Sequence, residues 1–128
     1  MKKIIVILLA TLILVGCNNS APIRSENVRD EFYEIGVMAI DMIDILFDAI
    51  DEGRGVEAFR DLETSWGYLI RAISGIQRTL LPYATEEEYI IYTNSSKIAT
   101  YFIGGFPSTE EVFRVRNDLA ILVGRRLR

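Results

Sequence analysis

The sequence contains no histidine and only one cysteine, Cys17, among its 128 residues. Without histidine, a serine or threonine nucleophile lacks its commonest general base, and zinc or copper lacks an imidazole ligand. A lone cysteine also excludes a disulfide within the chain and a Cys-x-x-Cys motif. Because di-metal carboxylate bundles need a Glu-x-x-His pattern, that class is excluded as well. We therefore expect no enzymatic activity, no metal and no cofactor.

Nucleotide-binding signatures are missing too. The sequence has no Gly-x-Gly-x-x-Gly stretch and no glycine-rich loop that ends in a phosphate-binding lysine. With 14 basic and 18 acidic residues the net charge is −4, so nucleic acid is not a natural ligand. The length suits one domain, and no internal repeat or low-complexity tract divides it.

The N-terminus has the layout of a secretory signal. Lys2 and Lys3 supply positive charge, and an unbroken apolar run follows from Ile4 to Val15. That run is too short to serve as a permanent membrane span, which needs about 20 apolar residues. Directly after it, Leu14-Val15-Gly16-Cys17 places small residues and the single cysteine where a signal peptidase would cut.

These residues resemble the lipobox of bacterial lipoprotein signal peptides, and the resemblance covers residues 1–20. It implies cleavage between Gly16 and Cys17 and attachment of diacylglycerol, with fatty chains such as palmitate, to the Cys17 sulfur. Two or more acyl chains anchor a protein stably in a bilayer. The resemblance thus implies a protein anchored on the extracytoplasmic side of a bacterial membrane. The alternative is an ordinary secreted protein whose cysteine lies near the cut by chance.

The chain is accordingly divided into three parts. Residues 1–16 form the cleaved signal peptide, residues 17–24 the lipidated cysteine and its tether, and residues 25–128 the folded domain. Cleavage removes two lysines and no acidic residue, so the mature chain is more acidic than the whole sequence.

In the folded domain, apolar residues recur at intervals of three and four, which is typical of amphipathic helices. We expect a first helix from an N-cap at Ser25 to about Glu52, ended by Gly53-Arg54-Gly55. A second helix is expected over residues 56–80, where Pro82 disfavours continuation, and a last one over residues 109–127 with Ser108 and Glu111 as a capping box.

Residues 85–103 allow two interpretations. Strand-like segments at 89–93 and 98–102 around Asn94-Ser95-Ser96 would make a hairpin and an α+β fold. Against this, Thr85 and Glu88 form a capping-box pattern, and the apolar spacing also fits a helix, which we favour. Short connections between the four expected helices then predict an all-α, up-down-up-down four-helix bundle.

An acidic row on the first helix is the most conspicuous polar feature: Asp41, Asp44, Asp48 and Asp51. The spacing places these carboxylates on one helix face, where they could gather calcium. A straight helix spreads them over ~15 Å, whereas calcium needs six to eight converging oxygens. We therefore favour a solvated face that is balanced by arginines of a neighbouring helix.

Several exposed-looking side chains are candidates for contact with other molecules. Tyr33 and Tyr68 fall on the polar sides of their helices, and Phe106 lies in a Gly-Gly-Phe-Pro loop, so all three are candidate partner contacts. Arg125, Arg126 and Arg128 could contact anionic lipid near the anchor. They could equally complement the dipole of the last helix or pair with the acidic first helix, and these roles are compatible with one another. Trp66 belongs to an apolar row and is expected in the core.

These observations lead to one hypothesis and one alternative. We expect a small membrane-anchored lipoprotein that acts as a protein-interaction module at the bacterial cell envelope, for example in exclusion of a phage or competitor. The alternative is an envelope carrier of a small ligand or cation. The sequence itself specifies neither the partner nor the oligomeric state.

Overall fold

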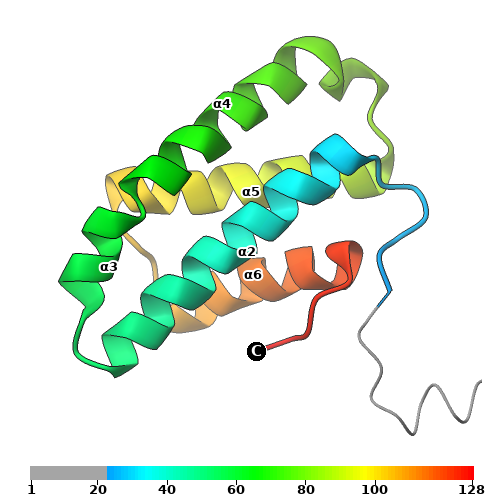
Figure 1. Cartoon of the computed structure of the whole chain (residues 1–128). Coiled ribbons are helices and arrows are strands. Elements are labelled where there is room, and N and C mark those ends of the chain that lie inside the picture. Colours follow the sequence, from blue (N-terminus) through cyan, green and yellow to red (C-terminus); the bar gives the residue numbers. More distant parts are fainter. Residues whose placement is uncertain (1–22) are drawn as a thin grey trace, which may run out of the picture.

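The computed structural model describes residues 23–128, so Gly16, Cys17 and the apolar run before them lie outside the described residues. That part of the chain is all-helical, which confirms the expected helical bundle and shows the hairpin alternative to be wrong (Figure 1). The elements are α2 (Asp30–Asp51), α3 (Gly55–Asp61), α4 (Glu63–Thr79), the short 3-10 helix η1 (Leu81–Tyr83), α5 (Glu86–Gly104) and α6 (Thr109–Val123).

Helix α2 is the central element of the bundle, because it packs against α3, α4, α5 and α6. It contributes the largest share of the core, including Phe32, Ile35 and Met42, which are almost completely buried. Gly36 permits its closest contact, since a Cβ atom there would lie 2.8 Å from Cγ1 of Val123 on α6. The 22 residues of α2 span about 33 Å, which sets the length of the domain.

The beginning of α2, the beginning of α5 and the end of α6 meet at one end of the bundle. The Thr85 hydroxyl donates to the Asn27 carbonyl oxygen at 2.9 Å, and the Ser25 N–H donates to the Leu122 carbonyl oxygen at 3.0 Å. We call this the tether end, because the described chain starts here at Ile23. The opposite, distal end holds the last turn of α2, all of α3 and the connection from α5 to α6 (Figure 1).

The expected N-cap at Ser25 is wrong. Helix α2 begins at Asp30, its N-cap is Arg29, and no side chain caps it there. The Arg29 N–H is instead bound by the Glu88 carboxylate of α5, at 2.9 Å. A contact between residues 59 positions apart therefore replaces the local cap that the sequence suggested.

The expected second helix, residues 56–80, is two helices. A turn at Leu62 separates α3 from α4, although neither proline nor glycine occurs at that position. Ala58 and Leu62 are both buried, and α3 packs against the end of α2. Tertiary packing of these two side chains accounts for a bend that local propensity does not predict.

The remaining helix ends follow the sequence more closely. Thr85 and Glu88 form the expected capping box at the start of α5. At α6 only half of the expected box forms: the Ser108 hydroxyl accepts from the Glu111 N–H, whereas the Glu111 carboxylate pairs with Arg114. Helix α6 stops at Val123, four residues before the expected end, because Gly124 adopts a left-handed conformation with φ of 72°.

Candidate functional site: an apolar groove at the distal end

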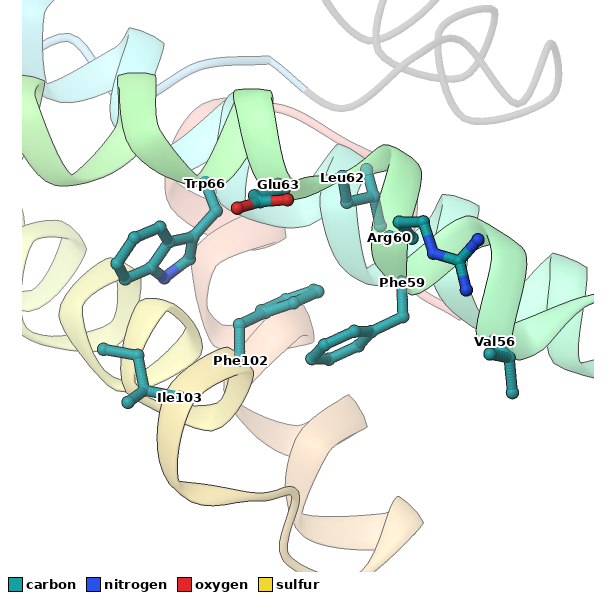
Figure 2. A pocket seen from close by; sticks show the side chains of 8 residues that line it. All are labelled: Val56, Phe59, Arg60, Leu62, Glu63, Trp66, Phe102 and Ile103. Atoms are coloured by element: carbon teal, nitrogen blue, oxygen red, sulfur yellow. The ribbon is translucent and has the colours of Figure 1, made fainter.

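A groove of about 540 Å³ lies between the α3–α4 bend and the end of α5 (Figure 2). Val56, Phe59, Arg60, Leu62, Glu63 and Trp66 line it from one side, and Phe102 and Ile103 line it from the other. Val56 and Ile103 are 78% and 70% exposed, which is high for large aliphatic side chains. We call this the apolar groove.

The bend at Leu62 explains why the groove is open. On an unbroken helix, the apolar row would continue against the bundle through Phe59 and Trp66. In the structure Leu62 and Leu69 are buried, whereas Phe59 is exposed and Trp66 is only half-buried. The Phe59 ring stacks on the Phe102 ring of α5, with centroids 5.6 Å apart, and the two rings form the floor shown in Figure 2.

Trp66, the single tryptophan of the chain, is held at one end of the apolar groove. Its indole N–H donates to the Ala99 carbonyl oxygen of α5 at 3.0 Å. The ring therefore has a polar anchor on the bundle while one side borders the groove. The expectation of a core tryptophan is met only in part, because the side chain packs against the core without being fully buried.

A second, smaller groove of about 300 Å³ adjoins the first and shares Val56 and Phe59 with it. Its other lining residues come from the end of α2, the first residue of α3 and the α5–α6 connection: Leu46, Ile50, Gly55 and Phe106. A Cβ atom at Gly55 would lie 2.8 Å from Cγ1 of Ile50, so a larger residue here would force the Ile50 side chain to shift. The two grooves form one continuous apolar surface, and such surfaces mark interaction sites on small proteins.

Phe106, one of the three expected contact residues, belongs to this distal end. Its ring packs edge-on against Phe102 and Phe47, with centroids 5.1 and 6.3 Å apart, and it is half-buried. The other two candidates lie elsewhere. Tyr33 is half-buried beneath the Arg24 guanidinium, 4.4 Å from the ring centroid, and Tyr68 is exposed on α4.

The acidic row is paired with arginines along much of its length. Arg116, which is buried, binds Asp44 through two hydrogen bonds of 3.0 and 2.8 Å. Arg128 contacts both Asp44 and Asp48. Arg125 lies 3.7 Å from Asp41. Within residues 23–128, no group of three or more histidine, cysteine or acidic side chains is arranged to hold a metal ion.

The C-terminal residues therefore fold back over α2 and α6. The Arg126 carbonyl oxygen accepts from Arg116, and Asn117 binds both the N–H and the carbonyl oxygen of Arg128. The Arg128 guanidinium also lies over the Phe113 ring. Arg125 and Arg128 thus pair with the acidic helix, which is one of the roles considered for the C-terminal arginines, and Arg126 contributes its backbone carbonyl oxygen.

The tether end contains the most completely buried charge of the described chain, the Glu88 carboxylate. Burial by itself raises the pKa of this group. Hydrogen bonds from the Arg29 side chain and from the backbone N–H groups of Thr85 and Arg29 outweigh that effect, and they lower the pKa to about 2 from 4.5. Glu88 is thus ionised at neutral pH and has no unused hydrogen-bonding capacity facing a cavity, so its role is structural.

Sequence reasoning did not identify the apolar groove. Its residues come from α3, α4 and α5, and the bend that exposes them has no local signal. Phe59 and Phe102 both occur among the apolar residues at helical spacing in the sequence. That spacing predicts the apolar face of a helix, but it does not predict which side chains on the face stay exposed to solvent.

No protein-family model, curated protein or solved structure matches this chain. In residues 23–128, none of the helices combines the length and the apolar character that crossing a bilayer requires.

Proposed function

We propose that this protein is a bacterial lipoprotein, anchored through Cys17 on the extracytoplasmic side of a membrane, whose domain binds another protein through the apolar groove. The observation that carries the proposal is the exposure of Val56 and Ile103 beside the Phe59–Phe102 stack. Small soluble domains rarely leave such side chains together on the surface unless a partner covers them. Exclusion of a phage or competitor component is one use of such binding.

The position of the apolar groove supports this function. The described chain begins at the tether end, and the groove lies at the distal end; helix α2, which runs between the two ends, is about 33 Å long. Only five residues, 18–22, separate the proposed anchor at Cys17 from Ile23, and the segment from Cys17 to Ile23 reaches about 20 Å at most. A short tether at one end and a groove at the other would leave the groove accessible above the membrane surface.

Site-specific photo-cross-linking in living cells tests the proposal. A photoreactive amino acid replaces Val56 in the full chain, and a matched variant carries it at Tyr83, which is equally exposed at the tether end. We expect a discrete protein adduct from position 56 and none of the same mass from position 83. Adducts that are absent from position 56, or identical at both positions, would contradict binding through the groove.

A second candidate function, carriage of a small apolar molecule, is supported by the size of the groove. Its volume of about 540 Å³ lies within the range of small-molecule sites, and its lining is largely apolar. Because Trp66 borders the groove and is the only tryptophan, its fluorescence reports occupancy. A saturable change in Trp66 emission with a micromolar fatty acid, together with no protein adduct at position 56, would favour carriage.

A further inference from the structure

The apolar groove carries one positive and one negative side chain on its α3–α4 side. Arg60 lies towards the Val56 end and Glu63 towards the Trp66 end, as Figure 2 shows. Both side chains are exposed, and among residues 23–128 neither takes part in an ion pair. The groove therefore has opposite charges at its two ends and an aromatic floor between them.

This arrangement is complementary to itself. Two copies can face each other across a two-fold axis that lies in the plane between them, beside the Phe59–Phe102 floor. The two grooves then run in opposite directions, so Arg60 of each copy faces Glu63 of the other. The exposed Val56 and Ile103 would then be covered on both copies at once. The net charge of −4 would by itself favour a strongly basic partner. The groove, however, is lined by one arginine and one glutamate, so it has no excess of negative charge to attract such a partner.

The chain's own N-terminal tether does not fit as the occupant. Residues 17–22 reach about 20 Å from Ile23, whereas the groove lies at the distal end of a bundle whose central helix, α2, is about 33 Å long. The occupant must therefore come from another molecule.

We infer that a second copy of this chain occupies the apolar groove, in a two-fold dimer that pairs Arg60 of each protomer with Glu63 of the other. The inference rests on the proposed function, since it identifies the protein that the groove binds. The residues that line the two adjoining grooves are fewer than the 20–30 per side of a standard interface. An interface of this size is typical of weak, transient complexes.

Charge-reversal variants test this inference. Two full-length copies of the chain with different tags are expressed in the same cells, and the fraction of one copy that is isolated together with the other is measured. Arg60→Glu in both copies places only glutamates at the contact, and Glu63→Arg in both copies places only arginines there. We expect each of these combinations to reduce co-isolation by about 10-fold relative to the wild type. When one copy carries Arg60→Glu and the other Glu63→Arg, opposite charges face each other again, and co-isolation returns.

Arg78→Glu is the matched control, because it makes the same charge change at an exposed position near the other end of α4. It should leave co-isolation unchanged. Arg60→Glu, Glu63→Arg and Arg78→Glu each reverse a charge in the first or last turn of a helix, so all three should lower the melting temperature by a similar few degrees at most. The inferred dimer would be contradicted if the wild-type copies are not isolated together. It would also be contradicted if the pair of Arg60→Glu and Glu63→Arg copies is isolated together no better than the single-variant combinations. If the adduct at position 56 then contains a different protein, the proposed function stands and only the identity of the partner is wrong.

Discussion

The Arg29 guanidinium donates to both oxygens of the Glu88 carboxylate, at 2.8 and 3.1 Å, across 59 positions of the sequence. The same carboxylate accepts from the backbone N–H groups of Arg29 and Thr85, each at 2.9 Å. One fully buried side chain thus satisfies donors at the beginnings of both α2 and α5. This joint fixes the tether end of the bundle.

Replacement of Glu88 by glutamine should destabilise the fold and reveal its pH dependence. The pKa of Glu88 is about 2 in the folded protein and 4.5 when unperturbed, so ionisation stabilises the fold above pH 4.5. A difference of this size corresponds to about 3 kcal/mol, and it is lost as pH falls from about 4.5 to 2. We expect Glu88→Gln to lower the free energy of unfolding at pH 7 by about 2–3 kcal/mol, as measured by urea titration.

The control is Glu86→Gln, which removes an exposed carboxylate from the same first turn of α5. It should change stability by about 0.5 kcal/mol or less. The difference between Glu88→Gln and the wild type should shrink as the pH is lowered to 3. A difference that stays constant from pH 7 to pH 3 would show that Glu88 is not the titrating group.

Asp44→Asn should have a comparable effect on the other side of the bundle. The substitution leaves the buried Arg116 guanidinium without its charged partner and also weakens the contact with Arg128. Breaking a buried ion pair costs about 3–5 kcal/mol, and partial exposure of Asp44 reduces this to about 2–3 kcal/mol. Chemical denaturation measures the loss.

Glu111→Gln is the exposed counterpart, because Glu111 pairs with Arg114 on the surface of α6. Pairs of this kind contribute about 0–1 kcal/mol, so this variant should remain close to the wild type. Equal losses for Asp44→Asn and Glu111→Gln would contradict a special role for the buried arginine.

Gly36→Ala and Gly67→Ala should change stability in opposite directions, although both replace a helical glycine. A Cβ atom at Gly36 would lie 2.8 Å from Val123 Cγ1 and 3.2 Å from Ile91 Cγ2. This overpacking between α2, α5 and α6 should cost about 1–3 kcal/mol. At Gly67 no atom lies within 4 Å, and alanine should stabilise α4 by about 0.5–1 kcal/mol. Melting temperatures that move in the same direction would show that the helices do not approach closely at Gly36.

The sequence predicted those features whose signal is local. The Thr85–Glu88 capping box, the stop after α2 at Gly53 and the cap at Ser108 all depend on residues within a few positions of one another. Their physical cause is a hydrogen bond or a glycine conformation that neighbouring residues already determine.

The features that the sequence did not predict depend on contacts between distant residues. Ser25 looked like a cap, but Glu88 takes that role from another helix. The bend at Leu62 arises from packing of α3 on α2, and it is this bend that exposes Phe59 and opens the apolar groove. The early end of α6 has a local cause, the left-handed conformation of Gly124. The prediction extended the helix past this glycine because positive charge, as in the C-terminal arginines, is typical of a helix C-terminus.

The proposed function requires that Cys17 carries a lipid anchor, whatever the apolar groove binds. Lipid labelling of Cys17 is therefore the most direct measurement. Cells that express the full chain are fed radioactive palmitate, beside cells that express Cys17→Ser. The account predicts that label enters the wild-type protein and that the Cys17→Ser chain stays unlabelled and leaves the membrane fraction or remains uncleaved. A wild-type chain without label, with Cys17→Ser processed and located as before, would contradict it.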